Sequence, residues 1–303
     1  MIPQFPNFKK LELKDKDEIY RLTAQYPPYS DFDFVSMWSW DFKEEIRISS
    51  LNGNLVVKFT DYVTGEPFYS FLGTKEVNAT TDILLKKSSK EGLVPRLKLI
   101  PEIVIHELDM TIFLAKSDPD HTDYVLSTDL LATYEGYEYA SKRRAVNQFI
   151  HHTEKARFAI LDLELPETIT EMTRLFLLWL EQKNISVVED HEFTAFQRCL
   201  ESPFRSELIA AGLYIDQILS AFWLIGSLGN SFAISHFEKA DTKSHIGIFP
   251  YLKQQAGKEL REKGIRFINL EQDLGILGLR QNKKSFNPVM FLQKYAIEAV
   301  SQA

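Results

Sequence analysis

The chain has 303 residues, about twice the length of a typical domain, so we expect either two domains or one large domain. Hydrophobic residues make up 45% of the chain and charged residues 25%, a composition typical of globular proteins and not of disordered ones. The net charge of −7 argues against a surface coated with positive charge for nucleic acid. The single cysteine, Cys199, excludes an internal disulfide framework and a thiolate zinc site.

No targeting or membrane-spanning segment is expected. The first ten residues lack a charged head followed by an apolar run, so they do not resemble a signal peptide. The best apolar stretch, 218–225, has the length of a strand and contains Ser220, so it is too short to cross a membrane. A cytoplasmic location is therefore expected.

The first half of the chain predicts strands, a helix and a further strand. Asn52-Gly53 is a strong hairpin signal, and Gly92 provides the left-handed residue that ends a helix. The expected elements are strands 46–50, 55–60 and 67–73, a helix over 80–91 and a strand over 97–100.

Residues 139–153 predict a long basic helix, because the segment has no Gly or Pro and an apolar set at helical spacing. We interpret this helix as a connector. The expected division is an N-terminal domain over 1–138, a connecting segment over 139–156 and a C-terminal domain over 157–303.

The second half predicts helices and strands in an order that requires a mixed sheet. A three-stranded meander followed by a crossover helix and another strand joins parallel strands, which indicates an α/β (α+β) fold with mixed sheets. The expected elements are strands 157–163, 207–214, 217–225, 231–238, 265–270 and 289–295, and helices 168–182, 191–200, 249–263 and 274–282.

Polar residues gather at two strand ends. In the strand that ends near residue 238, alternation places His236 and Glu238 on one face. After the strand 265–270, Asn269, Glu271 and Asp273 alternate onto one face, at the end of the strand where α/β sheets bind ligands. A solvated strand end explains the first group equally well, and Asp273 could instead cap the helix that follows.

Three cations follow on the next helix. Arg280, Lys283 and Lys284 are three and four residues apart, so they can point the same way and hold a phosphate. The alternative is a helix C-terminus that favours cations through its dipole. The histidines do not reproduce a zinc-ligand spacing, so no metal site is expected.

These segments carry a resemblance to a known family. The chain is similar to a family of bacterial proteins related to the C-terminal domain of phosphatidylglycerol lysyltransferase, within the GNAT superfamily of acyl-CoA N-acyltransferases. The residues that carry the resemblance are His236 to Lys239, Asn269, Glu271, Asp273, Gly275, Gly278 to Arg280, Lys284 to Phe286, Pro288, Lys294, Tyr295, Tyr137 to Tyr139, Lys142 to Arg144, Asn147, Ser30, Asp31 and Trp38.

The resemblance implies two tandem GNAT-like domains and, as in characterised relatives, transfer of an aminoacyl group from aminoacyl-tRNA to a lipid. We expect no counterpart of the membrane-spanning N-terminal part of those lipid synthases, which counts against a lipid acceptor. A small molecule and a lipid headgroup stay the two possible acceptors. Acyl-CoA is the alternative donor, but the glycine-rich loop that cradles its pyrophosphate is reduced to Gly247 within 245–250. No tightly bound cofactor is expected, and the oligomeric state stays open.

Acyl transfer needs a base for the acceptor and cations for the donor phosphates. Glu271 or Asp273 is the expected base, with Glu238 and His236 as second choices. Tyr251 could protonate the leaving group, or belong to the core. The expected substrate-binding residues are Asn269, Arg280, Lys283, Lys284 and, toward RNA, Lys142, Arg143 and Arg144.

Two alternatives stay open for these residues. The cations of the basic helix form either an RNA contact or a solvated helix face. The chain as a whole is either a transferase or a non-catalytic module that binds a phosphate-bearing ligand or RNA.

Overall fold

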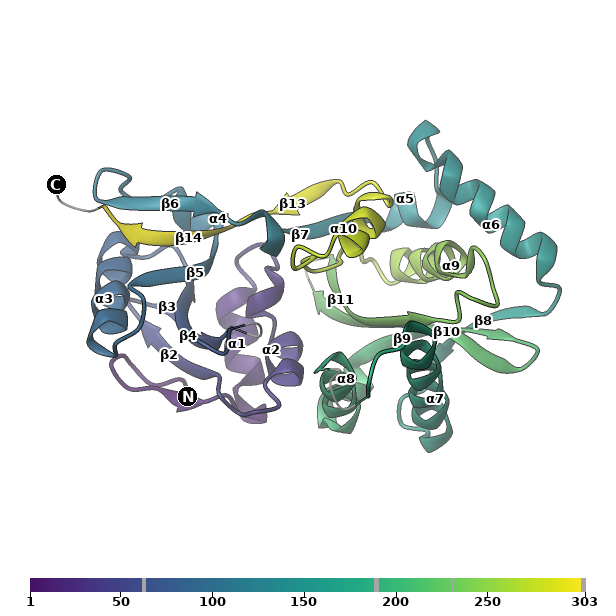
Figure 1. Ribbon diagram of the computed structural model, residues 1–303, viewed down its shortest axis with the longest axis horizontal. Helices are drawn as coiled ribbons and strands as arrows, with labels where there is room; N and C mark the ends of the chain where they lie inside the picture. Colours follow the sequence, from purple (N-terminus) through teal and green to yellow (C-terminus); the bar gives the residue numbers. More distant parts are fainter. Residues whose placement is uncertain (62–63, 188–190, 230, 301–303) are drawn as a thin grey trace. The chain divides into compact units, whose positions relative to one another are not determined.

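Figure 1 shows the computed structural model, which describes residues 1–61, 64–187, 191–229 and 231–300. The described chain contains two seven-stranded mixed sheets and divides into two compact units. Unit 1 consists of residues 1–123, 272–277 and the segment from 291 onward, and unit 2 consists of residues 124–271 and 278–290. The expected mixed α/β fold is confirmed.

Unit 1 is built on a sheet with the strand order β1-β2-β3-β4-β5-β14-β6. Its core packs Val56, Tyr69 and Phe71 of the sheet with Leu84 and Leu85 of a helix. The strands are β1 (Lys9–Lys10), β2 (Arg47–Leu51), β3 (Asn54–Thr60), β4 (Pro67–Leu72), β5 (Arg96–Pro101), β6 (Phe113–Ser117) and β14 (Lys294–Ala299), and the helices are α1 (Lys16–Thr23), α2 (Phe34–Trp40), α3 (Val77–Lys90) and α4 (Glu102–Ile105).

The local signals in the first half act as expected. Asn52 and Gly53 both have positive φ, 54° and 80°, as the tight turn between β2 and β3 requires. Gly92, with φ of 72°, follows the end of α3. β4 and β5 are parallel and α3 crosses between them, so this part of the expected topology is confirmed.

Unit 2 repeats the pattern in a sheet with the order β13-β7-β12-β11-β10-β9-β8. Helix α9 covers one face of this sheet, while α7 and α8 cover the other (Figure 1). The strands are β7 (Asp123–Ser127), β8 (Ala156–Leu161), β9 (Leu208–Ile215), β10 (Ile218–Gly229), β11 (Phe232–Ala240), β12 (Phe267–Asn269) and β13 (Met290–Leu292), and the helices are α5 (Thr128–Thr133), α6 (Ala140–His152), α7 (Pro166–Lys183), α8 (His191–Glu201), α9 (Ile248–Glu262) and α10 (Leu277–Lys284).

Each sheet contains one strand from the other half of the chain. β14, near the end of the chain, lies between β5 and β6 in the first sheet, and β7, from the first half, pairs with β12 in the second. The division of the chain therefore differs from the expected one, in which a connecting segment over 139–156 separates two sequential domains. The basic helix α6 packs against α9 inside unit 2.

Two elements near the C-terminus also differ from expectation. The predicted strand over 289–295 is two strands, β13 and β14, which belong to different sheets. The predicted helix over 274–282 begins only at Leu277, because Leu274 and Gly275 have positive φ values of 54° and 74° that a helix does not accommodate.

A buried lysine joins the exchanged strands at their starts. Lys294, the first residue of β14, is fully buried, and its Nζ lies 2.7 Å from Oδ1 of Asp123, the first residue of β7. The same ammonium group forms an ion pair with Asp31 and donates to the Ser30 hydroxyl at 3.2 Å. The backbone N–H and hydroxyl of Ser30 donate to Asp123 at 2.8 and 2.7 Å, so both oxygens of that carboxylate have partners.

The cluster has more negative than positive charge, because two carboxylates share one lysine. Burial by itself lowers the pKa of Lys294, but the charges of Asp123 and Asp31 raise it above the ordinary value. Burial raises the pKa of Asp31, against the opposing effect of Lys294 and with the charge of Asp123 adding to the increase. Asp31 is therefore the carboxylate whose charge is costly, and Asp123 is the partner of Lys294.

Replacing Lys294 with Met should destabilise the chain by about 3–5 kcal/mol, because it leaves two buried carboxylates without their cation. Asp31→Asn is the matched control: it removes the surplus charge and keeps the Lys294 to Asp123 pair, so it should cost no stability at pH 7. Urea denaturation at pH 7 compares the two variants with the wild type.

The pH dependence follows from the direction of the Asp31 shift. A carboxyl whose pKa is raised by folding stabilises the fold at low pH, and that contribution is lost as the pH rises from the ordinary value of 3.8 through the raised pKa. The free energy of unfolding of Asp31→Asn, relative to that of the wild type, should therefore increase as the pH rises from about 4 to 7. Equal destabilisation by Asp31→Asn and Lys294→Met at pH 7 would contradict this account.

Candidate functional site

A β-bulge in β11 changes the direction of His236. Across the ladder, Leu224 pairs with Phe237 and Ile225 pairs with Ser235, so His236 is the extra residue. A Cβ added to Gly226 would lie 2.4 Å from Nε2 of His236, which places the imidazole on the face that carries Gly226. Phe222 lies four residues before Gly226 in the same strand, so the two residues are on the same face. The Phe222 ring stacks on Phe196 of α8, so this is the face covered by α8.

The bulge places His236 and Glu238, which strand alternation predicts on one face, on opposite faces of the sheet. Glu238 pairs across the ladder with Trp223, which belongs to the core under α9, so Glu238 lies on the opposite face from His236. The expectation that His236 and Glu238 share a face is wrong, because it assumed unbroken alternation and a bulge adds a residue.

His236 instead meets Glu271. The imidazole Nδ1 lies 3.9 Å from Oε1 of Glu271, with the His236 side chain 2% exposed and the Glu271 side chain 21% exposed. The ladder between β11 and β12 comprises three registered pairs and ends at Ile234 and Asn269, whereas β11 continues to Ala240. The two side chains therefore meet just beyond the end of the ladder.

The backbone around Glu271 is fixed from two sides. Glu271 has a φ of 61°, a left-handed conformation that a non-glycine residue adopts only when its surroundings impose it. The buried Asn269 imposes it in part, because its Oδ1 accepts the Glu271 N–H at 2.7 Å. The exchanged strand β7 contributes as well, since Tyr124 O accepts the Leu270 N–H at 2.8 Å. Asn269, expected to bind substrate, thus positions Glu271.

Glu238 has a different partner. Its carboxylate forms an ion pair with Lys253 of α9, whose side chain is 1% exposed. Lys253 is not among the expected site residues, although the sequence contains a signal for it. The lysine lies on the apolar face of α9, among Leu252, Ala256 and Leu260. A charge at such a position indicates a buried ion pair.

Asp273 lies in the loop before α10. It is fully buried in unit 1, and its Oδ1 accepts the Gly275 N–H at 2.9 Å. Because α10 begins at Leu277, Asp273 does not cap that helix. Glu271, by contrast, belongs to unit 2.

The three cations of α10 do not form one face. Lys283 is buried, and its Nζ donates to the carbonyl of Leu270 at 2.6 Å, next to Glu271 in the chain. Arg280 is half-buried, and Lys284 is exposed. The three cations therefore do not form one surface, in contrast to the expectation that they hold a phosphate together.

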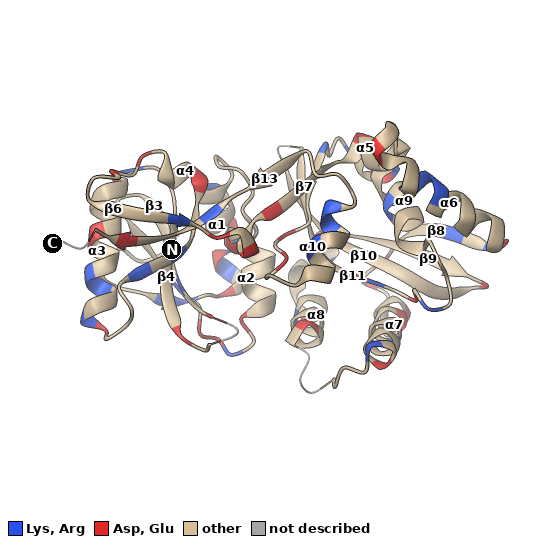
Figure 2. Ribbon diagram, turned by 45° about the horizontal axis from the view of Figure 1, so that its top comes forward, with Lys and Arg blue, Asp and Glu red and all other residues tan. Residues whose placement is uncertain are grey.

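Figure 2 shows positive charge on α6. Its cations Lys142, Arg143 and Arg144 differ from one another in their contacts. Arg143 donates to the carbonyls of Tyr134 and Gly136, so it holds the turn before α6. Lys142 is half-buried and donates to the Ser285 hydroxyl at 2.6 Å, while Arg144 is exposed. Lys142 and Arg143 thus make contacts within unit 2, and Arg144 lies at its surface.

Tyr251 is half-buried and lies at the edge of the core. Its ring lies 4.8 Å from the ring of Phe149, and it packs against the buried cluster of unit 2. The alternative role, protonating a leaving group, gains no support from this position.

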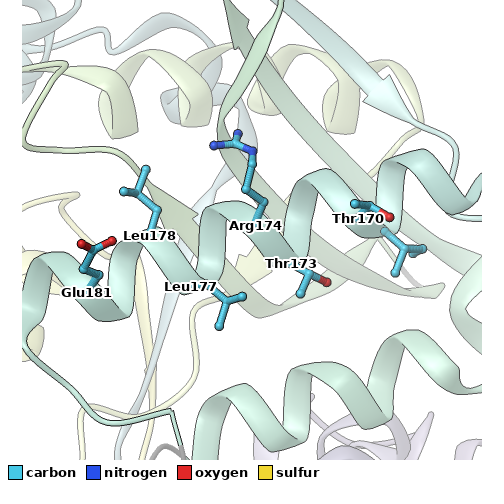
Figure 3. A pocket seen from close by; sticks show the side chains of 7 residues that line it. Thr170, Thr173, Arg174, Leu177, Leu178 and Glu181 are labelled. Carbon is cyan, nitrogen blue, oxygen red and sulfur yellow. The ribbon is translucent and has the colours of Figure 1, made fainter.

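A surface hollow of about 620 Å³ lies on α7, lined by residues between Ile169 and Glu181. Figure 3 shows its labelled side chains on one helix. One of them, Arg174, donates to the carbonyl of Leu219 at 2.6 Å. None of the expected site residues lines it.

The described residues contain neither a metal-binding cluster nor a membrane-spanning helix. In the ranges 1–61, 64–187, 191–229 and 231–300, no three His, Cys, Asp or Glu side chains are grouped to hold a metal ion. In the same part of the chain, no helix has the length and apolar character needed to cross a membrane.

Comparisons with known proteins give a consistent family and fold. A family model described as "Phosphatidylglycerol lysyltransferase, C-terminal" matches residues 23–298. A conserved protein of unknown function from Bacteroides thetaiotaomicron VPI-5482 is 25% identical, with a TM-score of 0.84 over 99% of this chain and 100% of that chain. No curated protein gives a significant match.

Two further solved structures share the fold at lower identity. L-PGS from Bacillus licheniformis is 15% identical, with a TM-score of 0.64 over 100% of this chain and 95% of that chain. A tandem GNAT protein from the clavulanic acid biosynthesis pathway is 10% identical, with a TM-score of 0.52 over 98% and 99% of the two chains. The fold is therefore a tandem GNAT-like fold, as expected.

Lys283 and Lys284 provide a matched pair for testing the description of α10. Lys283→Met should cost about 1–3 kcal/mol of stability, because it removes the donor to a buried carbonyl. Lys284→Met, one residue away and exposed, should change stability by less than about 0.5 kcal/mol. Urea unfolding measures both, and equal effects would show that Lys283 is not held as described.

Proposed function

The chain belongs to the phosphatidylglycerol lysyltransferase C-terminal family, and from this premise we propose that it is an acyltransferase with Glu271 as its general base. The proposed reaction moves an aminoacyl group from aminoacyl-tRNA to an amine or hydroxyl acceptor. The observation that carries the proposal is the contact of Glu271 with His236 beyond the end of the β11 to β12 ladder.

The chemistry assigned to each group follows from its position. Glu271 is half-buried, so it can reach an acceptor and take its proton as the acceptor attacks the carbonyl carbon. His236 is almost fully buried and is the positioning partner of that carboxylate. Asn269 and the backbone of β7 hold Glu271 in its left-handed conformation, which gives the base one fixed direction.

The start of α9 favours aminoacyl-tRNA over acyl-CoA as donor. A pyrophosphate needs approachable backbone N–H groups at a helix N-terminus. Here a Cβ at Gly247 would lie 2.3 Å from the carbonyl oxygen of Ala145, so α6 covers this glycine. Pro250 has no N–H, and the N–H of Tyr251 already donates to the Gly247 carbonyl at 3.1 Å.

The proposal sets the reaction in the cytoplasm, where aminoacyl-tRNA is formed, and assigns Arg144 of α6 to the RNA backbone. Each phosphate contact of such a cation makes binding weaker as salt rises. The acceptor class is an amine or hydroxyl, in a small molecule or a lipid headgroup. Vesicles containing phosphatidylglycerol and soluble amines are the two acceptor sets to compare.

Glu271→Gln should reduce the transfer rate by about 10²–10⁴-fold, because the amide cannot accept the proton. Glu262→Gln, an exposed glutamate of α9, is the matched control and should leave the rate unchanged. The assay incubates labelled aminoacyl-tRNAs with each acceptor set and quantifies the product by mass spectrometry. Transfer by Glu271→Gln at the wild-type rate would overturn the assignment.

Gly226→Ala tests the position of His236 without changing either site residue. The added methyl would meet Nε2 at 2.4 Å, so the imidazole must move relative to Glu271 and transfer should slow by at least tenfold. Gly278→Ala is the control, because its new Cβ meets nothing within 4 Å. If Gly226→Ala transfers as fast as Gly278→Ala, the location of His236 does not matter for the reaction.

A further inference from the structure

Two lysine head groups meet over one aromatic ring in unit 2. The Nζ of Lys142, from α6, lies 3.7 Å from the centroid of the Phe286 ring, and the Nζ of Lys253, from α9, lies 5.2 Å from the same centroid. Phe286 is 1% exposed and follows the end of α10. The ring therefore brings two positive charges together in a largely buried place.

The two lysines are neutralised unequally. Lys253 is paired with the carboxylate of Glu238 and also lies over the ring of Trp223, 4.0 Å from its centroid. Lys142 donates to a neutral group, the hydroxyl of Ser285, at 2.6 Å. The cluster thus contains two cations and one carboxylate, and the carboxylate contacts the cation that is more deeply buried.

The uncompensated charge falls on Lys142. Burial, together with the charge of Lys253, lowers the pKa of Lys142 from the ordinary 10.5 to about 8. Near pH 8 a large share of the molecules therefore carries Lys142 as a neutral amine, the nucleophilic form of the side chain. The Phe286 ring favours the ammonium form of Lys142 through a cation–π interaction and holds its head group in place. Lys253 lies over the same ring, so this stabilisation is shared between two cations.

We propose that Lys142 is a covalent acylation site for activated esters and thioesters. The neutral Nζ attacks the acyl carbonyl carbon and an N–C bond forms. The C–O or C–S bond breaks, and the leaving oxygen or sulfur takes the amine proton through water, so that an alcohol or a thiol is released. The product is an amide without positive charge. This step does not use Glu271, so it stands or falls separately from the proposed transferase reaction.

Acylation would alter the contacts of α6. The amide loses the charge that repels Lys253 and can no longer present an ammonium group to Ser285 and Phe286. Because the Lys142 to Ser285 hydrogen bond joins α6 to the segment after α10, modification releases one of the contacts between these two parts of unit 2. Tyr139 still donates to the carbonyl of Phe286 at 3.1 Å.

The test measures acetylation of each lysine in the folded full chain between pH 6 and 10. One arm uses limiting N-hydroxysuccinimidyl acetate as the ester, the other uses acetyl-CoA as the thioester, and peptide mass spectrometry gives the rate at each position. Lys155 and Lys86, with side chains 76% and 70% exposed, are the internal references. The rate at Lys142 should level off above about pH 8, while the reference rates keep rising toward pH 10.

A variant pair makes the result specific to the cluster. The double variant Glu238→Gln with Lys253→Gln removes one charge of each sign, so no buried charge is left alone. Acetylation of Lys142 at pH 7.5 should then fall severalfold, and its plateau should move to higher pH. Circular dichroism confirms that the variant is folded, and Lys142→Arg confirms the assignment of the modified peptide.

Three results would overturn the proposal. These are Lys142 left unmodified in both arms, a rate at Lys142 that rises in step with Lys155 up to pH 10, and an unchanged profile in the folded double variant. Acetylation in one arm alone supports the proposal and identifies whether the ester or the thioester is the source.

Discussion

The pairing of Lys294 with Asp123 is the interaction on which the arrangement of this chain depends. Asp123 opens the strand that leaves unit 1 for the second sheet, and Lys294 opens the strand that returns to the first sheet. A buried ammonium group needs a carboxylate in contact with it, so the two strands must begin side by side. The candidate site follows directly, because the residues after Asp123 pair with the segment that ends at Glu271.

The candidate site relies on two departures from regular strand geometry. A bulge in β11 turns His236 to the face opposite Glu238, and a left-handed backbone at Glu271 ends the extended conformation of its strand. Both departures are held by neighbouring groups: Gly226 leaves room for the imidazole, and Asn269 accepts the N–H of Glu271. Such local strain is found at functional sites, where it fixes the direction of a reacting group.

The sequence predicts local elements well and long-range partners poorly. The Asn52-Gly53 hairpin, the end of α3 at Gly92 and the two crossover helices all follow from local rules. The exchange of β7 and β14 does not, because pairing depends on residues far away in the chain. Ser30, Asp31 and Lys294 belong to the family resemblance without an assigned role, and only the structure brings them together around Asp123. Likewise, alternation predicts the wrong face for His236, since a bulge has no composition signal here.

A double-mutant cycle determines whether Glu271 and His236 act as one unit in acyl transfer, as proposed. The measurement is the transfer rate of Glu271→Gln, His236→Gln and the double variant under identical conditions. Residues that act as a unit give non-additive losses, so the double variant should be no slower than the slower single variant. Losses that multiply, as independent residues produce, would contradict the account.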